Sequence, residues 1–255
     1  MVRPVRNCGW ALFLDVDGTL LEIATGPDAV CVPARTRYLL QTAQSRESGA
    51  VALVSGRTIA DLDRLFDPMR LPVAGVHGLE RRDAAGRQTT LEVEPALLDD
   101  ARERIAPLLA AHTGLRLEDK RCSLALHFRQ VPHLEPQARA VFDDVMQRAS
   151  PHFHLQTGKY CLEIKPAVCS KRSAIEAFMG EPPFAGRLPV FVGDDDTDEE
   201  GFEAVNELGG LSMRVGHKPV SAARWQFTTV KAVLRWLHRP EQPEVCPMPR
   251  DGFLP

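Results

Sequence analysis

The sequence predicts an α/β protein built on a parallel β-sheet, with a smaller α/β domain inserted into it. Short uninterrupted apolar runs alternate with helical stretches, which is typical of this class. Acidic and hydroxyl residues follow several of these runs directly, as they do at the ligand-binding edge of a parallel sheet. The middle of the chain differs, because its strands alternate apolar and polar residues. With 255 residues, 44% of them hydrophobic and 25% charged, the composition excludes a disordered or collagen-like chain.

Four uninterrupted apolar runs are expected to form the central strands, because such a run suits a strand that is covered on both faces. They span residues 10–14, 51–54, 73–76 and 189–192. Between the first two runs, apolar residues at positions 38–43 have helical spacing. Strand–helix–strand units give parallel strands that bind their ligands at the carboxyl ends. We therefore expect a Rossmann-like parallel-sheet core.

A compact module is expected within residues 95–165. Apolar residues from Leu97 to Leu109 line one helical face, and Pro107 is expected to kink or shorten that helix. A second amphipathic helix fits residues 138–149, and strands fit residues 115–118, 124–128, 153–156 and 160–164. The order α-β-β-α-β-β assigns residues 95–165 to an inserted domain, and residues 1–94 with 166–255 to a discontinuous core. The tail from Pro240 is expected to be irregular.

Charge, hydropathy and cysteine usage limit the expected partners. The 31 Lys and Arg residues and 34 Asp and Glu residues leave a net charge of −3, so no overall field draws the chain to nucleic acid or to an anionic membrane. No apolar run approaches the roughly 20 residues of a membrane span. The six cysteines form no Cys-x-x-Cys pair, which disfavours a zinc or redox site. We expect a cytoplasmic monomer that holds any phosphate in a local site and has no nucleic-acid or membrane partner.

Two carboxylates follow the first apolar run, in the string Asp15-Val16-Asp17-Gly18-Thr19. Like charges packed at the end of a buried strand are costly unless a cation or a proton compensates them. The alternative interpretation is an acidic turn that Gly18 bends.

A second acidic cluster follows the run at 189–192, with six acidic side chains in the seven positions 194–200. An EF-hand loop would require Gly at Glu199 and a bidentate Glu at Val205, so that interpretation fails. Two acidic clusters at two parallel strand ends are explained more simply by a shared Mg²⁺ ion, which prefers carboxylates together with substrate phosphate.

Two further elements fit a phosphate site. Ser55, Gly56 and Arg57 follow the run at 51–54 and offer a hydroxyl and backbone N–H groups at the head of the next helix. Lys171 opens another helix and could neutralise a phosphoryl group. Taken separately, Ser55 could be a helix cap and Lys171 a surface charge. Together with both acidic clusters, at strand ends and in this order, they are much harder to obtain by chance.

These motifs resemble the haloacid dehalogenase superfamily of phosphotransferases and, within it, the trehalose-6-phosphate phosphatases, over about residues 10–238. The resemblance implies that Asp15 is the nucleophile and Asp17 the general acid and base. It implies that Ser55, with Gly56 and Arg57, binds phosphate, and that Lys171 is both a catalytic and a phosphate-binding residue. The implied Mg²⁺ ligands are Asp15, Asp17 through its backbone carbonyl, Asp194, and, directly or through water and the lysine, Asp195 and Asp198.

More specific strings point to the sugar. They are residues 75–80, 117–120, 125–129, 162–166 and 194–202. The resemblance implies that module 95–165 is a cap in which Glu118, Lys120 and Glu163 grip sugar hydroxyls, and His77 is expected to touch the substrate. Glu118 and Lys120 are two apart, so on a strand they share one face. The alternative is a surface ion pair worth under about 1 kcal/mol.

The sequence departs from the family's pattern at two positions. Arg172 follows the motif lysine where the family commonly has Gly, and Asp196 stands where it often has an apolar residue. If Arg172 faces the site, it would alter phosphate access. If it faces solvent, the change is harmless.

The expected function is therefore Mg²⁺-dependent hydrolysis of trehalose 6-phosphate to trehalose and phosphate, through an aspartyl-phosphate intermediate, in trehalose biosynthesis. One alternative is another capped sugar-phosphate phosphatase, of the sucrose-phosphate or mannosylglycerate-phosphate type. A phosphate-accepting receiver domain would be about half this long. A sugar-phosphate-binding protein without turnover is the third alternative.

Overall fold

The structure, a computed structural model, describes residues 9–23, 30–91, 95–119, 123–149, 153–158, 160–167, 169–238 and 246–247. These residues divide into two compact units: one lies within Met1–Thr89 and Lys171–Pro255, and the other within Thr90–Ser170. The first unit contains a sheet of nine described strands, which takes its last strand from residues up to Thr90, and the second a sheet of four. No helix in the described part of the chain is long and apolar enough to cross a membrane.

The second unit is inserted into the first, which therefore consists of two segments of the chain. Before the second unit it contains β1 (Trp10–Leu14), α1 (Ala34–Arg46), β2 (Val51–Val54), α2 (Ile59–Phe66), β3 (Val73–Gly75), β4 (Glu80–Arg82) and β5 (Gln88–Thr90). After it come α5 (Lys171–Met179), β10 (Leu188–Gly193), α6 (Glu199–Glu207), β11 (Leu211–Val215), β12 (Trp225–Phe227), α7 (Val230–His238) and β13 (Cys246–Pro247). The expected parallel-sheet core is confirmed.

The nine-stranded sheet has the order β13-β12-β11-β10-β1-β2-β3-β4-β5. The strands from β12 to β3 are all parallel, and β1 pairs with β10 on one side and with β2 on the other. From β1 the chain proceeds through α1 to β2 and β3. After the second unit it returns through α5 to β10, on the opposite side of β1. The strand order therefore reverses at β1, and such a switch point is where α/β sheets bind ligands.

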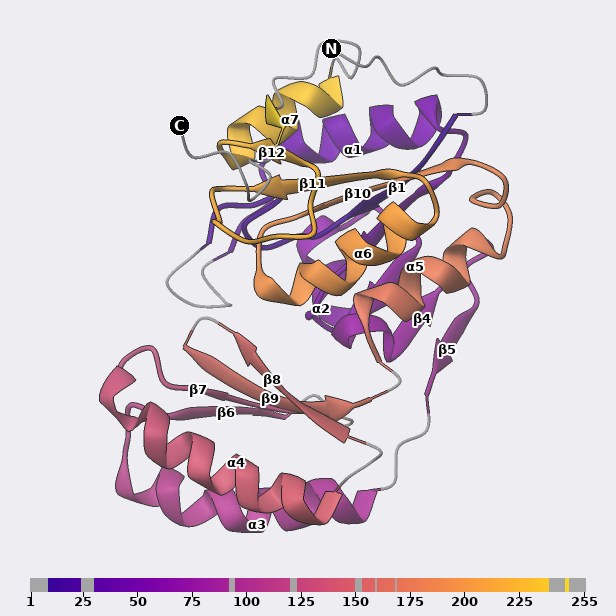
Figure 1. Ribbon diagram of the computed structural model, residues 1–255. Coiled ribbons are helices and arrows are strands. Elements are labelled where there is room, and N and C mark those ends of the chain that lie inside the picture. Colours follow the sequence, from indigo (N-terminus) through magenta and orange to yellow (C-terminus); the bar gives the residue numbers. More distant parts are fainter. Residues whose placement is uncertain are drawn as a thin grey trace. The chain divides into compact units, whose positions relative to one another are not determined.

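Helices cover both faces of this sheet (Figure 1). The apolar cluster on one face includes Leu39 of α1 and Trp236 of α7, which pack against alternate residues of the strands. The cluster on the other face includes Phe178 of α5 and Phe202 of α6. Burial on both sides explains why strands such as β1 and β2 consist of uninterrupted apolar residues.

The second unit is a four-stranded antiparallel sheet with two helices on one face. Its elements are α3 (Pro95–Ala111), β6 (Arg116–Asp119), β7 (Leu124–His127), α4 (Glu135–Ala149), β8 (Phe153–Gly158) and β9 (Cys161–Pro166), and the strand order is β6-β7-β9-β8. Alternate strand residues such as Leu126 and Leu162 join Ala101 of α3 and Phe142 of α4 in its apolar core. The predicted α-β-β-α-β-β order is confirmed.

Two elements differ in detail from the expectation, because one strand ends a residue earlier and one helix continues past its proline. Helix α3 is not shortened at Pro107 but continues to Ala111. Ala101 and Ile105, fully buried in the core, hold the helix in place although proline removes one hydrogen bond from it. The strand expected at 73–76 ends at Gly75, because Val76 and His77 adopt left-handed φ angles of 46° and 54°.

The borders of the compact units and part of the tail differ from the sequence prediction. The compact units change at residues 89/90 and 170/171, where the sequence suggested 94/95 and 165/166. Within the tail, Cys246–Pro247 forms a short strand that pairs antiparallel with β12, so these two residues are not irregular. The rest of the tail lies outside the described residues.

Candidate active site

Three adjacent parallel strands deliver three of the predicted site residues to one edge of the sheet. Asp15 follows β1, Asp194 follows β10, and Ser55 follows β2. The register pairs Leu14 with Val192, so the ends of β1 and β10 lie level, and the Asp15 amide donates to the Val192 carbonyl at 2.9 Å. The site therefore lies at the switch point beside β1, where the strand order reverses.

Three carboxylates converge there. Single oxygens of Asp15, Asp194 and Asp198 all lie within 4.8 Å of one another. Asp15 is 5% exposed and Asp198 fully buried. Two glycines allow this approach, because a Cβ on Gly18, where φ is +85°, would lie 2.0 Å from Asp194 Oδ2, and one on Gly193 would meet the Asp198 carboxylate. Buried carboxylate oxygens in this density are the donor set of a hard divalent cation, so the residues fit Mg²⁺.

Lys171, the first residue of α5, joins the cluster from the face of the sheet that α5 and α6 cover. Its Nζ donates to Asp15 Oδ1 at 2.8 Å and to Asp198 Oδ1 at 2.5 Å. Burial alone would lower the pKa of Lys171, but the two carboxylates outweigh burial and raise that pKa above its usual value. The ammonium group therefore stays charged. The alternative of a surface charge is wrong for Lys171, which is 2% exposed.

Two of the carboxyl groups have raised pKa values. Burial is the largest cause for Asp15, and the neighbouring Asp198 and Asp194 add to it, so its pKa rises well above the usual value although Lys171 opposes the shift. Burial, followed by the charge of Asp198, raises the pKa of Asp194 to about 7. The two raised pKa values show that negative charge is unfavourable in the cluster. A bound cation would favour the ionised carboxylates.

Asp198 shapes the loop as well as the cluster. Its Oδ2 accepts from the backbone N–H groups of Asp194 and Asp195, both at 2.9 Å, while its Oδ1 accepts from Lys171. The Asp195 side chain completes a capping box and accepts from the Asp196 amide at 2.7 Å. Among the described residues, the group of clustered carboxylates that could hold a metal ion includes Asp198 but not Asp195.

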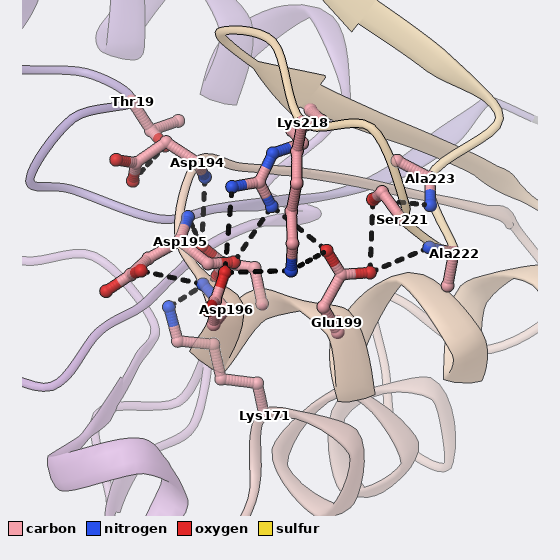
Figure 2. Close-up of polar contacts among 12 residues, drawn as sticks. Thr19, Lys171, Asp194, Asp195, Asp196, Glu199, Lys218, Ser221, Ala222 and Ala223 are labelled. Carbon is pink, nitrogen blue, oxygen red and sulfur yellow. Dashed lines mark hydrogen bonds and ion pairs between the residues drawn. The ribbon is translucent and has the colours of Figure 1, made fainter. Parts of the chain in front are cut away.

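A second polar group fastens this loop to the segment after β11 (Figure 2). Glu199, the first residue of α6, accepts from Arg214, Lys218, Ser221 and the Ala222 amide at 3.0, 3.3, 3.1 and 2.7 Å. Lys218 also donates to Asp196 at 2.8 Å, which explains the acid at this exposed position. Four donors on one carboxylate hold the loop that carries Asp194.

Arg57, which the sequence predicts to bind phosphate, contacts a carboxylate of the first motif. Its guanidinium forms a bidentate ion pair with Asp17, with Nε to Oδ2 at 2.5 Å and Nη2 to Oδ1 at 2.8 Å. The Asp17 carboxylate is therefore held apart from the three clustered carboxylates, at the partly exposed rim of the site. The planar fork of Arg suits this pairing, which orients the Asp17 side chain.

The segment after β2 packs against the segment after β3. The His77 amide donates to the Ser55 carbonyl at 3.0 Å, and a Cβ on Gly56 would lie 2.8 Å from His77 Nε2. Ser55 Oγ, 2% exposed, accepts from the Arg57 amide at 3.2 Å. The true cap of α2 is Thr58, and Glu80 accepts from the Ile59 amide, so two of that helix's first N–H groups are already bonded.

In the second unit, two predicted sugar-binding residues lie in one cross-strand row. Glu118 of β6 and Glu163 of β9 both pair with Ala125 of β7, so their side chains share the face of the sheet opposite Leu126 and Leu162. Lys120 lies outside the described residues. The two glutamates belong to the second unit, and the Asp15 cluster belongs to the first.

Arg172 does not enter the cluster. Its guanidinium bonds Glu207 at 2.6 Å and Glu203 at 3.2 Å, both on α6. The side chain thus ties α5 to α6 at the surface, and Lys171 alone of the pair points to the carboxylates.

Sequence reasoning missed several supporting residues. The Thr19 hydroxyl, fully buried, donates to Asp194 at 3.4 Å. Glu199 and Arg214 hold the loop, and Ser123 and His127 contact the cap carboxylates. A buried hydroxyl inside the first motif was the available signal for Thr19. Nothing local marked the others, whose partners lie 9 to 40 residues away.

Comparison with known proteins gives a consistent result. A family model described as trehalose-phosphatase matches residues 13–231. Trehalose-6-phosphate phosphatase of Escherichia coli (strain K12) is 43% identical over 234 residues, which cover 92% of this chain and 87% of that protein. A probable trehalose-phosphate phosphatase of Sinorhizobium fredii is 43% identical over 84% of this chain and 80% of its own length.

Solved structures agree on the fold. The C-terminal domain of C. albicans trehalose-6-phosphate phosphatase gives a TM-score of 0.80 at 19% identity, over 91% of this chain and 92% of that one. A phosphatase of the haloalkanoate (HAD) enzyme superfamily from Bacteroides thetaiotaomicron gives a TM-score of 0.65 at 16% identity, over 94% of this chain and 99% of that one.

Proposed function

The chain belongs to the trehalose-phosphatase family of phosphoric monoester hydrolases, and we propose that it hydrolyses trehalose 6-phosphate to trehalose and phosphate with Mg²⁺ as its cofactor. The observation that carries the proposal is the cluster of Asp15, Asp194, Asp198 and Lys171 at the switch point of the sheet. Phosphoryl transfer needs alignment and charge neutralisation more than covalent chemistry, and this cluster supplies both kinds of charge.

Asp15, Asp194 and Asp198 would hold the metal, with the backbone carbonyl of Asp17. When bound, Mg²⁺ would neutralise charge on the phosphate and on the attacking carboxylate. Asp198 keeps the amides of Asp194 and Asp195 bonded, and Thr19 bonds the Asp194 side chain. The ligand-bearing loop is therefore held in place by the chain itself.

Asp15 would attack phosphorus in line, forming an aspartyl-phosphate and releasing O6 of the sugar. Lys171, kept positive by its two carboxylate neighbours, would stabilise the equatorial oxygens together with Ser55. Asp17 would donate the proton to the leaving oxygen and then take one from the water that hydrolyses the intermediate. The bidentate contact with Arg57 supports a defined orientation of Asp17, and we assign Arg57 to that role rather than to phosphate binding.

We assign sugar recognition to the second unit, residues 90–170, as a cap in which Glu118, Lys120 and Glu163 bind hydroxyl groups. The shared cross-strand row of Glu118 and Glu163 supports this assignment. His77 packs against Gly56 in the core unit, which favours a role near phosphate over a role in the cap.

The deciding experiment measures phosphate release from trehalose 6-phosphate, glucose 6-phosphate and sucrose 6-phosphate, with and without Mg²⁺. We expect Mg²⁺-dependent release, with kcat/KM highest for trehalose 6-phosphate by at least about tenfold. A higher kcat/KM for sucrose 6-phosphate would contradict the substrate assignment and favour another capped sugar-phosphate phosphatase. Binding with no release in a single turnover would contradict catalysis.

A cytoplasmic monomer without nucleic-acid or membrane partners stays a prediction. Light scattering coupled to size exclusion checks the oligomeric state, and a mass near 28.2 kDa is expected. A mass of twice that value would contradict it.

A further inference from the structure

The central position between the two cap carboxylates is occupied by the smallest side chain of its row. Glu118, Ala125 and Glu163 lie directly opposite one another across β6, β7 and β9. Neighbouring strands are about 4.8 Å apart, so the two glutamates start from backbones about 10 Å apart, on either side of a single methyl group. Because a glutamate side chain has several rotatable bonds, each carboxylate could adopt many positions unless another residue holds it.

Two residues, one directly before β7 and one at its end, each form a hydrogen bond with one of the glutamates. The Ser123 hydroxyl donates to Glu163 Oε1 at 2.7 Å, and the His127 imidazole Nε2 bonds Glu118 Oε2 at 2.8 Å. His127 ends β7 on the same face as Ala125, and Ser123 directly precedes the strand. Ser123 is fully buried and Glu163 is 7% exposed, whereas His127 and Glu118 are more open.

These contacts lie on the face that the helices do not cover. The neighbouring residues Leu124 and Leu126 point to the opposite face and form part of the apolar core with α3 and α4. Removing the Ser123 hydroxyl or the His127 ring nitrogen therefore leaves the core packing of β7 unchanged. The two contacts act on the position of the carboxylates rather than on the sheet.

We propose that Ser123 and His127 are positioning residues that determine specificity for the disaccharide, because they hold Glu163 and Glu118 in the orientation that receives the sugar. The proposal rests on the function proposed above, in which those two glutamates bind sugar hydroxyls. Carboxylates that are ordered before the ligand arrives lose less conformational entropy on binding, which strengthens the interaction. Both residues belong to the second unit, whereas the carboxylate cluster proposed to bind the phosphoryl group belongs to the first, so we expect the effect to be confined to substrates that carry the sugar.

The test compares trehalose 6-phosphate with 4-nitrophenyl phosphate, which has no sugar. We expect Ser123→Ala to lower kcat/KM for trehalose 6-phosphate about tenfold, mainly through KM, and to change kcat/KM for the aryl phosphate less than twofold. His127→Leu should behave likewise. His127→Gln, which keeps a side-chain amide able to reach the carboxylate, should restore kcat/KM to within about threefold of the original protein.

A matched control removes a hydroxyl from the same sheet without touching either carboxylate. Thr157 on β8 accepts from Arg139 on α4, and Thr157→Val should change neither substrate's kcat/KM more than twofold. Calorimetric titration with trehalose alone adds a readout independent of turnover, and weaker binding is expected in Ser123→Ala and His127→Leu. If Ser123→Ala fails to fold, the two His127 variants decide the question.

Three outcomes are distinguishable. Selective loss with rescue by Gln supports the proposal. Equal loss on both substrates, or no loss on trehalose 6-phosphate, overturns it. The function of the glutamates is tested separately by Glu163→Gln and Glu118→Gln. If these variants lose activity selectively on trehalose 6-phosphate while Ser123→Ala and His127→Leu do not, the proposed function stands and only the positioning role is removed. If the Gln variants show no selective loss, the proposed sugar site itself is contradicted.

Discussion

At the scale of single residues, the site is governed by how many negative charges surround one positive charge. Lys171 contacts two carboxylates, while three carboxylates share the cluster. Burial, together with the negative charges that one ammonium group does not neutralise, raises the pKa values of Asp15 and Asp194. A divalent cation supplies the missing charge, and this balance determines how the site responds to substitution and pH.

Replacing the proposed nucleophile should abolish turnover without unfolding the protein. Asp15→Asn keeps the shape of the side chain but removes the attacking carboxylate, so we expect phosphate release to fall by at least about 10³-fold. Asp196→Asn is the matched control, because Asp196 is exposed and outside the cluster, and it should keep kcat within about threefold. Circular dichroism checks the fold of both. Turnover in Asp15→Asn close to that of the control would remove Asp15 as the nucleophile.

Mg²⁺ affinity should weaken as the pH falls through 7. The pKa of Asp194 is raised to about 7 by burial and by Asp198, so below that pH a proton competes with the cation for this carboxylate. We expect the Mg²⁺ dissociation constant to be at least about tenfold larger at pH 6 than at pH 8. Calorimetric titration at the two pH values measures it. The same affinity at both would contradict the proposed ligand role of Asp194.

The same shift affects the stability of the metal-free protein. Because the folded-state pKa of Asp194 is raised above its value in the unfolded chain, the contribution of this group to stability is complete below about pH 4 and is lost as the pH rises through 7. In the chelated protein at pH 8, Asp194→Asn should therefore raise the free energy of unfolding by about 1–3 kcal/mol. Urea unfolding at pH 8 checks this, and a lower stability of the variant would show the sign to be wrong.

At the scale of elements, helices α5 and α6 present Lys171 and the Asp194 loop to the same place. Lys171 opens α5, and Asp198 directly precedes α6. Surface ion pairs of Arg172 with Glu203 and Glu207 link the two helices, and Glu199 links α6 to the segment after β11. The helix starts are thereby held where the strands end, which is where the chemistry is proposed.

Arg172 should matter for stability more than for turnover. Its side chain points to α6 and not to the cluster, so Arg172→Gly, which introduces the residue common in the family, should leave kcat/KM within about twofold. Surface ion pairs contribute little, so we expect Tm to fall by no more than a few degrees, with part of the loss due to glycine in a helix. Differential scanning calorimetry beside Arg172→Ala separates these causes. A large gain or loss in kcat/KM would place Arg172 in the site.

At the scale of the whole molecule, the proposed metal joins segments that lie far apart in the chain. Asp15 follows β1, whereas Asp194 and Asp198 follow β10. An ion bound by both segments stabilises only the folded state, since the unfolded chain separates the ligands.

Chelation should therefore have two linked effects. EDTA should stop phosphate release from trehalose 6-phosphate and also lower Tm at pH 8, and added Mg²⁺ should reverse both. Asp194→Asn provides the control, because its Tm should respond less to Mg²⁺. Activity that persists after exhaustive chelation would contradict the metal-dependent mechanism.

The amino-acid sequence alone determined the fold class, the central strands of the first unit, the order of the elements in the second and the polar segments that follow the strands. Uninterrupted apolar runs such as residues 10–14, and acids or hydroxyls directly after them, are local features that do not depend on distant partners. Only the tertiary structure decided which partner each side chain takes. It brings Arg57 to Asp17 across 40 residues, includes Asp198 but not Asp195 in the carboxylate cluster, and turns Arg172 toward α6. These pairings depend on strand order and on which helix covers which face, and the free energy that selects them belongs to contacts between segments rather than to any one segment.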